Sequence, residues 1–438
     1  MAAQRAIAAG VSVLMAFAAA MGVQAAPPHD LDDNGLYAPG ELSAIYRHSP
    51  LKPLPTVTAG RVTEDTRAAR LGQYLFFERR FSANGAVSCA TCHVPEKAFA
   101  DARRVGTGLA AGERNTPGLL NVAFERWYFW DGRADSLWAQ ALGPIENAKE
   151  FGGDRLNTLH LVAEDAPLRR AYELVFGPPP PLGDAERFPR HASPDSAPGS
   201  PAARAWSAMS LADRDAANRM YANLGKAIEA YERKLVDGDS AFDRYVAALK
   251  SGDRAGQRAY PAAAKRGLKL FVGAAQCELC HSGPSFSDGE FHNIGLPLLA
   301  GESADNGRAA GIDIVRASDF NGIGPYSDHP EGRAKDQLSY LPPPESQLGS
   351  FKTPNLRNVA LTAPYMHDGR FDTLSAVLDF YAKGREASRG QMLLGEREAT
   401  LDLVPRLSSD QADDLTAFLN TLTGRALPAE LTTAPGEP

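Results

Sequence analysis

The sequence predicts a mainly helical protein made of two similar domains in tandem, joined by long loops. Three paired features indicate this class: a C-x-x-C-H motif, a Gly-x-x-Leu-Phe segment before it, and an amphipathic stretch that closes each half. They lie at 89–93 and 277–281, at 72–76 and 267–271, and near 224–236 and 413–424. In both closing stretches, apolar residues recur at i, i+3 and i+4, the spacing of one helix face. The 32 prolines favour long ordered loops.

The first 25 residues have the layout of a secretory signal peptide. Arg5 precedes an apolar run from Ile7 to about Ala20, and a short cleavage site follows at 23–25. We expect cleavage after Ala25. The alternative is a membrane anchor, but the run is short and no basic stop-transfer cluster follows it. No later segment approaches the ~18 apolar residues that a spanning helix needs. An exported protein of the periplasm, without a membrane span after cleavage, is therefore expected.

The remaining length divides into two domains with extensions at both ends. At roughly 150 residues per domain, residues 26–438 suffice for two. We predict an N-terminal extension at 26–60, a first domain at 61–245, a second domain at 246–425 and a flexible tail at 426–438. The Pro/Ser/Ala-rich stretch 177–205 indicates a surface insertion in the first domain. The formal charge of −7 argues against a nucleic-acid partner and suits a small, basic protein partner.

The four cysteines all belong to the two C-x-x-C-H motifs, as Cys89, Cys92, Cys277 and Cys280. This motif attaches c-type haem through two thioether bonds, and the adjacent histidine coordinates the iron. A redox-active disulfide or a zinc site would use the same thiols. Two complete motifs behind a signal peptide, with no cysteine left over, favour two covalently bound haem c groups ligated by His93 and His281. Both halves are therefore expected to be cytochrome-c-like domains.

Several longer motifs resemble those of the bacterial dihaem cytochrome c peroxidase superfamily, and most closely its MauG branch. They are SCATCH, RNTPGLLN, FWDGRADSL, FHNIGLP and FKTPNLRNVALTAPYMHDG, at 88–93, 114–121, 129–137, 291–297 and 351–369. The resemblance extends from about Leu71 to Thr423. It implies that H2O2 reacts at the first haem, that the second haem stores or receives electrons, and that one Ca²⁺ lies near the interface of the domains.

The same resemblance implies that the first haem is open at rest. Many family members block it with a loop histidine, but the loop 94–113 has none, and Thr107 is at the matching position. Glu150 matches the distal glutamate, which would move a proton between the two peroxide oxygens. Glu146 is the reserve for that role. Gln140 and Pro144 match other positions of the distal pocket.

Other expected site residues lie between the two haems. Trp130 matches the tryptophan that relays electrons in the family, whereas Trp127 is expected to be structural. The calcium ligands would be the Asn115 side chain and the carbonyls of Thr362 and Pro364, an oxygen-only set that suits Ca²⁺. A turn-stabilising amide is the alternative role for Asn115. We expect a structural or propionate-contacting His292 and surface positions for the remaining histidines, His29, His48, His160, His191 and His329.

The sixth ligand of the second haem distinguishes two kinds of enzyme. Conventional members have a methionine fourteen residues after the histidine of their P-Y-x-H-x-G motif; here that histidine is His367, and the residue is Tyr381. A helix capped by Asp372 or Thr373 and ending at Gly384 would place Tyr381 on an apolar face, which by itself favours a core tyrosine. The resemblance to MauG implies ligation instead, with Met366 and Met392 as competitors. A tyrosinate is anionic and favours ferric or higher oxidation states.

We therefore expect a periplasmic dihaem c-type peroxidase that uses H2O2 to form a high-valent dihaem state and oxidises an aromatic residue of a partner protein. The alternative is a conventional cytochrome c peroxidase supplied with electrons by a cytochrome c or cupredoxin. A non-enzymatic dihaem electron carrier is a third. One departure concerns the exit of electrons: Ala275 replaces the tryptophan that MauG has two residues before its second C-x-x-C-H. The partner or the exit route therefore differs from that of MauG.

Overall fold

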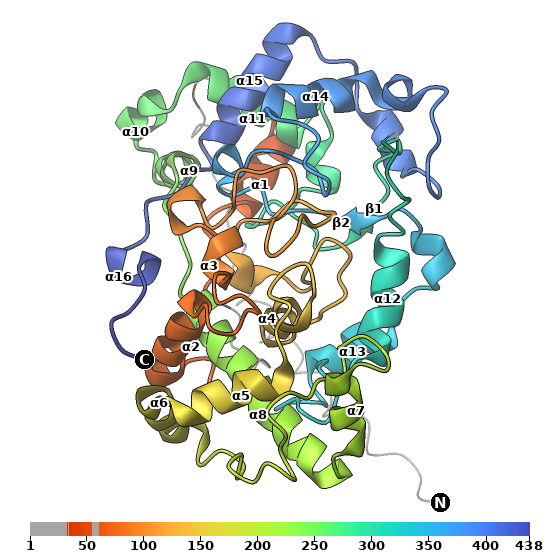
Figure 1. Ribbon diagram of the computed structural model, residues 1–438. Helices are drawn as coiled ribbons and strands as arrows, with labels where there is room; N and C mark the ends of the chain where they lie inside the picture. Colours follow the sequence, from red (N-terminus) through yellow and green to blue (C-terminus); the bar gives the residue numbers. More distant parts are fainter. Residues whose placement is uncertain (1–32, 34, 55–60, 300) are drawn as a thin grey trace, which may run out of the picture.

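Two separate hydrophobic cores organise the chain in the computed structural model, which describes residues 33, 35–54, 61–299 and 301–438 (Figure 1). The signal peptide expected at 1–25 lies outside these residues. Within the described part, no helix combines the length and apolar character required to cross a membrane.

The first core is built around a tight crossing of two helices, α2 (Thr66–Phe77) and α8 (Leu211–Glu232). At the crossing, a Cβ added to Gly72 would lie 1.8 Å from the carbonyl oxygen of Ala227, so only glycine allows this approach. Phe76 packs edge-on against Tyr231, with 5.2 Å between their rings. Three further helices surround this pair: α4 (Leu137–Glu146), α5 (Arg155–Glu164) and α6 (Ala166–Phe176).

The second core repeats this construction with α11 (Ala262–Val272) and α15 (Ser409–Asn420). A Cβ on Gly267 would lie 1.9 Å from the carbonyl oxygen of Asp414, and Phe271 packs against Phe418 at 5.1 Å. The repeated Gly-x-x-Leu-Phe segment thus has a physical reason: its glycine admits the closing helix and its phenylalanine meets the aromatic residue on that helix. Two more helices complete this end, α9 (Ala241–Ser251) and α14 (Leu374–Lys383).

Short elements connect the two cores, and a two-residue ladder lies between them. Strand β1 (Phe291–His292) pairs antiparallel with β2 (Phe351–Lys352), Phe291 opposite Lys352. The other elements are α1 (Pro39–Arg47), α3 (Cys89–Cys92), η1 (Pro95–Lys97), η2 (Val122–Phe124), α7 (Pro201–Ala208), α10 (Arg254–Ala259), η3 (Cys277–Leu279), α12 (Arg308–Ala317), α13 (Arg333–Ser339), η4 (Pro344–Gln347), η5 (Val359–Leu361), η6 (Gly384–Ser388), η7 (Ala399–Leu403) and α16 (Ala429–Thr432).

The first described helix, α1, and the C-terminal tail each pack on the core that is farther away in sequence (Figure 1). Leu42 and Ile45 of α1 belong to the second core. In the tail, Leu427 and Leu431 pack against the first core, and the Gln73 side chain donates to the carbonyl of Thr433 at 3.0 Å. The prediction of a flexible tail at 426–438 is therefore wrong for this docked part.

The structure also corrects two other predictions, the boundary between the domains and the exposure of the stretch 177–205. The expected division after residue 245 falls inside α9, whose Phe242 and Leu249 belong to the second core. The stretch 177–205 is not only a surface insertion, because Phe188 is completely buried in the first core.

Two histidines expected on the surface are buried. His160 is 7% exposed, and its Nε2 lies 3.0 Å from the carbonyl oxygen of Phe188. His48 is completely buried at the end of α1, with its Nε2 3.2 Å from the carbonyl oxygen of His281. In both cases the covering partner is distant in sequence, Phe188 for His160 and His281 for His48.

Candidate active site

Both C-x-x-C-H motifs form a single tight turn that presents its histidine to the interior. The turn is α3 in the first half and η3 in the second. The His93 N–H donates to the Cys89 carbonyl at 2.8 Å, and the His281 N–H donates to the Cys277 carbonyl at 2.9 Å. All four thiols are free, so each turn offers two thiols and one imidazole on a short stretch of backbone.

The two motif histidines are held by the same kind of hydrogen bond. Nδ1 of His93 lies 2.9 Å from the carbonyl oxygen of Phe99, and Nδ1 of His281 lies 2.8 Å from that of Phe286. Because a carbonyl only accepts, Nδ1 carries the proton and Nε2 keeps its lone pair. Burial lowers the pKa of both rings and favours this neutral form. A metal-ligating histidine is oriented in this way, so both turns fit a haem c group.

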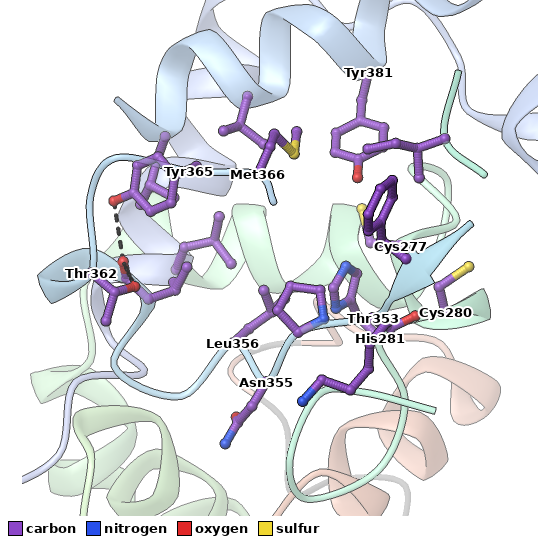
Figure 2. Close-up of a pocket in the computed structure, with 18 of the residues that line it drawn as sticks. Cys277, Cys280, His281, Thr353, Asn355, Leu356, Thr362, Tyr365, Met366 and Tyr381 are labelled. Carbon is purple, nitrogen blue, oxygen red and sulfur yellow. Dashed lines mark hydrogen bonds between the residues drawn. The ribbon is translucent and has the colours of Figure 1, made fainter. Parts of the chain in front are cut away.

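A cavity of about 260 Å³ lies beside the second motif, with Cys277, Cys280 and His281 in its wall. Tyr381 lines the opposite side, where its hydroxyl points across the cavity toward His281 (Figure 2). Tyr381 lies on α14, which has the predicted limits: Thr373 caps it by accepting from the Ala376 N–H at 3.1 Å, and it ends at Gly384. Burial raises the pKa of Tyr381 well above its ordinary value, and the nearby Cys280 and Cys277 add to the effect.

The two competing methionines have different positions. Met392 is 73% exposed, which excludes it as a ligand in this conformation. Met366 lines the cavity, and its sulfur points into the same space as the Tyr381 hydroxyl (Figure 2). The structure therefore brings Tyr381 and Met366 to the face opposite His281.

Trp130 and the expected calcium ligands also line this cavity, whose wall includes residues of both halves. Asn115, Thr362 and Pro364 all line it together with Trp130. The Trp130 Nε1–H donates to the Asn115 carbonyl at 2.9 Å. The side-chain NH₂ of Asn115 donates to the Arg103 carbonyl at 3.0 Å, which directs its amide oxygen away from that loop. An amide oxygen and two backbone carbonyls fit the oxygen-only ligand set of Ca²⁺.

Glu150 and Glu146 have very different surroundings near the first motif. Glu146 is buried, and its Oε2 forms an ion pair with Arg155. The Ser193 hydroxyl donates to Oε1 of the same carboxylate. Glu150 is half-buried and accepts from the Asn147 amide at 2.8 Å. Burial raises the pKa of Glu150, while Arg133 and the Asn147 hydrogen bond oppose the rise. Glu146 is thus held in an ion pair, whereas Glu150 has a neutral side-chain partner, the Asn147 amide, among the described residues.

Other parts of the expected distal pocket adjoin the same region. The thiol of Cys92 lies 3.5 Å from the Thr107 carbonyl oxygen, so the loop without a histidine passes beside the first motif. Gln140 and Pro144 are four residues apart on α4 and therefore share one helix face.

Comparisons with known proteins agree with this geometry. A profile of the family "Di-haem cytochrome c peroxidase" matches residues 66–251. The chain is 34% identical over 371 residues to the methylamine utilization protein MauG of Methylorubrum extorquens, covering 83% of this chain and 79% of that protein. The chain belongs to the di-haem cytochrome c peroxidase family.

Further relatives of this di-haem peroxidase include both functional types. It is 30% identical over 443 residues to the cytochrome c551 peroxidase of Pseudomonas aeruginosa, which covers 97% of this chain and 96% of that protein. Among solved structures, a MauG-like protein associated with microbial copper homeostasis is 27% identical with a TM-score of 0.56, covering 88% of this chain and 96% of that one. Membership implies two haems, and the two C-x-x-C-H turns supply residues that fit them.

A second internal repeat of the peroxidase was not part of the sequence predictions. Residues 115–137 and 352–374 align without gaps, 237 positions apart, and 12 of 23 positions are identical. The backbone repeats as well: η2 and η5 occupy matching positions, and Asn121 and Asn358 before them have φ angles of 65° and 64°. Comparing the sequence with itself would have revealed this repeat.

The repeat relates Trp130 to His367 and Pro144 to Tyr381. Tyr381 faces the second motif from α14, and Pro144 has the equivalent place on α4 of the first half. A proline side chain has no atom that can coordinate a metal. The repeat therefore supports an open first haem independently of the missing loop histidine.

Two further positions of the peroxidase have informative surroundings. His292 lies between two carboxylates, with Asp288 at 2.8 Å and Glu398 at 3.1 Å. The Asp288 hydrogen bond is the main cause of a rise in its pKa to about 11, so it is a charged group of the cavity wall. Ala275 is completely buried in the second core, which also contains Leu42 of α1. A partner protein cannot contact this position directly.

Proposed function

We propose that this chain is a periplasmic dihaem c-type peroxidase that uses H2O2 to oxidise an aromatic residue of a partner protein. The observation that carries this proposal is the Tyr381 hydroxyl, which faces His281 across the cavity beside the second C-x-x-C-H turn. When bound, the haems would supply iron that reacts with peroxide and stores oxidising equivalents.

In the first half, Cys89 and Cys92 would attach the haem and His93 would ligate it through Nε2. Pro144, the counterpart of Tyr381, offers no ligand atom and would leave this place to peroxide. Glu150 accepts a proton from the inner peroxide oxygen and returns it to the outer one, the work of a general acid–base. Its raised pKa suits this cycle because a carboxyl group with a higher pKa is a stronger base. Gln140 lies on the same face of α4 as Pro144 and shapes the pocket.

In the second half, Cys277 and Cys280 would attach the haem, and His281 and Tyr381 would bind its iron. Burial raises the pKa of Tyr381, so its hydroxyl loses the proton only when a cation binds the oxygen. The resulting phenolate carries a negative charge, which stabilises oxidised iron. Trp130, in the cavity wall between the two halves, relays electrons between the two sites.

Ca²⁺ is the third proposed component. The Asn115 amide oxygen and the carbonyls of Thr362 and Pro364 would bind it, with water completing the coordination. The ion would connect the first half, through Asn115, to the second half. It would also fix Trp130, because the Trp130 indole donates to the backbone of Asn115.

A conventional cytochrome c peroxidase is the second candidate. Ala275 favours it, because this completely buried residue has no oxidisable side chain at the position where MauG has a tryptophan. Such an enzyme would take electrons from a small redox protein, a cytochrome c or a cupredoxin, and release water.

The test compares two electron sources for the purified dihaem protein. With H2O2 and a small secreted protein encoded by a neighbouring gene, we expect a mass change on a tryptophan or tyrosine of that protein. With H2O2 and reduced cytochrome c or cupredoxin, we expect slow turnover. Fast, sustained oxidation of the redox protein without modification of the secreted protein would reject the proposal in favour of the conventional enzyme.

A further inference from the structure

The two halves contact each other through equivalent residues of the repeat. The Asn115 N–H donates to the His367 carbonyl at 2.7 Å, and the Lys352 N–H donates to the Trp130 carbonyl at 2.9 Å. Asn115 and Lys352 are counterparts, as are Trp130 and His367. The interface therefore has an approximate twofold relation, because the first residue of each repeat donates to the position that Trp130 and His367 share in the other repeat.

The side chain of Lys352 extends this relation to the proposed calcium ligands. Its ammonium forms an ion pair with the Glu125 carboxylate and donates to the Trp127 carbonyl at 3.1 Å. In the other repeat, Glu125 corresponds to Thr362 and Trp127 corresponds to Pro364. Hence the positions that surround the Lys352 ammonium are the counterparts of those proposed to bind Ca²⁺, and Lys352 is the counterpart of Asn115.

The environment of Lys352 is that of a held cation and not of a surface lysine. Its side chain is 11% exposed, and that of Glu125 is 20% exposed. A charge this far from solvent needs oxygen partners, because losing its hydration is costly. Trp127, which supplies the carbonyl, is fixed in turn: the guanidinium of Arg308 lies 4.0 Å from its ring centre and is itself 2% exposed.

We propose that the Lys352 ammonium is a built-in cation that does in one repeat what Ca²⁺ does in the other. It binds the Trp127 carbonyl, while the backbone N–H of the same residue binds the Trp130 carbonyl. Lys352 thereby fixes both ends of the segment that holds Trp130, and it is a positioning residue for the electron relay. One half of the interface uses a metal ion, and the other half uses a side chain.

This assignment leads to a gain-of-site experiment. Lys352→Asn replaces the ammonium with the amide that its counterpart Asn115 carries, and it leaves the Glu125 carboxylate without a cation. An amide oxygen, a carboxylate and a carbonyl, together with water, form a suitable Ca²⁺ site. We expect the dihaem K352N protein, dialysed against CaCl₂ and then against buffer, to hold one more Ca²⁺ per two haems than the wild type, measured by elemental mass spectrometry.

Three matched variants separate the possible causes. K352R keeps a cation and K352M offers no ligand, so both should hold the wild-type number of Ca²⁺; K335N changes an exposed lysine on α13 and should also be unchanged. An unchanged count in K352N, or an extra ion in K352M or K335N, would overturn the proposal. K352M and K335N report Ca²⁺ that binds adventitiously to a disturbed protein, and counting per two haems restricts the result to protein that carries both haems.

The comparison with Ca²⁺ and the role of Lys352 in electron exchange rest on the proposed function, whereas the Ca²⁺ count in K352N is measured without any peroxide reaction. In K352M we expect the two haems to exchange electrons more slowly than in K352R, by roughly tenfold or more, because a misplaced relay loses efficiency. The resting EPR signals of both haems should remain. Equal exchange rates in the two variants would refute the positioning role. An absence of peroxide reaction in every variant, with the extra Ca²⁺ still present in K352N, would reject the proposed function alone.

Discussion

Replacing Glu150 with glutamine should abolish most of the peroxide reaction and leave the fold intact. The structure gives Glu150 one side-chain partner, the Asn147 amide at 2.8 Å, which a glutamine can also engage. A lost general acid–base costs about 10²–10⁴ in rate, or about 2.7–5.4 kcal/mol in the barrier. Stopped-flow mixing of the resting protein with H2O2, followed by haem absorbance, measures this rate directly.

Glu146→Gln is the matched control because the two carboxyl groups are four residues apart. Glu146 is paired with Arg155, and the two side chains are 4% and 5% exposed. Breaking a buried ion pair costs about 3–5 kcal/mol, which lowers the melting temperature by roughly 6–20 °C for a domain of this size. We expect E146Q to unfold earlier, measured by circular dichroism, and to react with peroxide at the wild-type rate once folded.

The pair of variants separates catalysis from structure. A wild-type peroxide rate in E150Q would refute its role as acid–base. Similarly, a slow reaction in E146Q together with unchanged melting would transfer that role to Glu146.

Four further outcomes follow from the same geometry. Tyr381→Met should raise the reduction potential of the second haem in a spectroelectrochemical titration, because a neutral ligand replaces an anionic one; an unchanged potential would exclude the tyrosine as a ligand. Pro144→Met places a thioether at the counterpart of the Tyr381 position. The first haem should then become low-spin in the resting EPR spectrum and lose its reaction with peroxide. A persistent high-spin signal would contradict the inference from the repeat. The rate at which the wild type reacts with peroxide should fall as the pH decreases through the raised pKa of Glu150. Arg133→Gln removes a charge that lowers this pKa, so the inflection in the pH profile of the variant should lie at higher pH. A shift of the inflection to lower pH would show that another group titrates. Gly267→Ala should lower the melting temperature, because the new Cβ would lie 1.9 Å from a backbone oxygen and overpacking costs about 1–3 kcal/mol of stability. Helix propensity alone predicts a gain in stability of about 1 kcal/mol. A higher melting temperature would therefore contradict the contact.

The local sequence pattern was sufficient to predict the limits of the helix that carries Tyr381. Its cap and end are encoded by neighbours in the chain, Thr373 and Gly384, and the structure has both. The haem-binding residues were equally local, because two thiols and an imidazole within five residues can act together only in one tight turn.

Residues whose partners are distant in sequence were predicted less well. His48 and His160 were expected on the surface, but segments from elsewhere in the chain bury both. The sequence preferred Glu150 over Glu146 only through the family resemblance, and the structure adds a physical reason, the ion pair between Glu146 and Arg155. Lys352 was missed although the repeat is present in the sequence, because only the folded interface shows that its ammonium meets Glu125.

The sequence by itself determined the helical class, the two haem-attachment turns, the helix of Tyr381 and membership of a peroxidase superfamily. These features depend on spacing within a few residues or on motifs that occur twice. The tertiary structure alone decided how the two repeats meet. It placed Lys352 and Asn115 at equivalent sites, buried Ala275 in the core that includes α1, and docked the tail on the first half. Such contacts depend on which surfaces remain apolar or charged after each half has folded, and no local spacing specifies them.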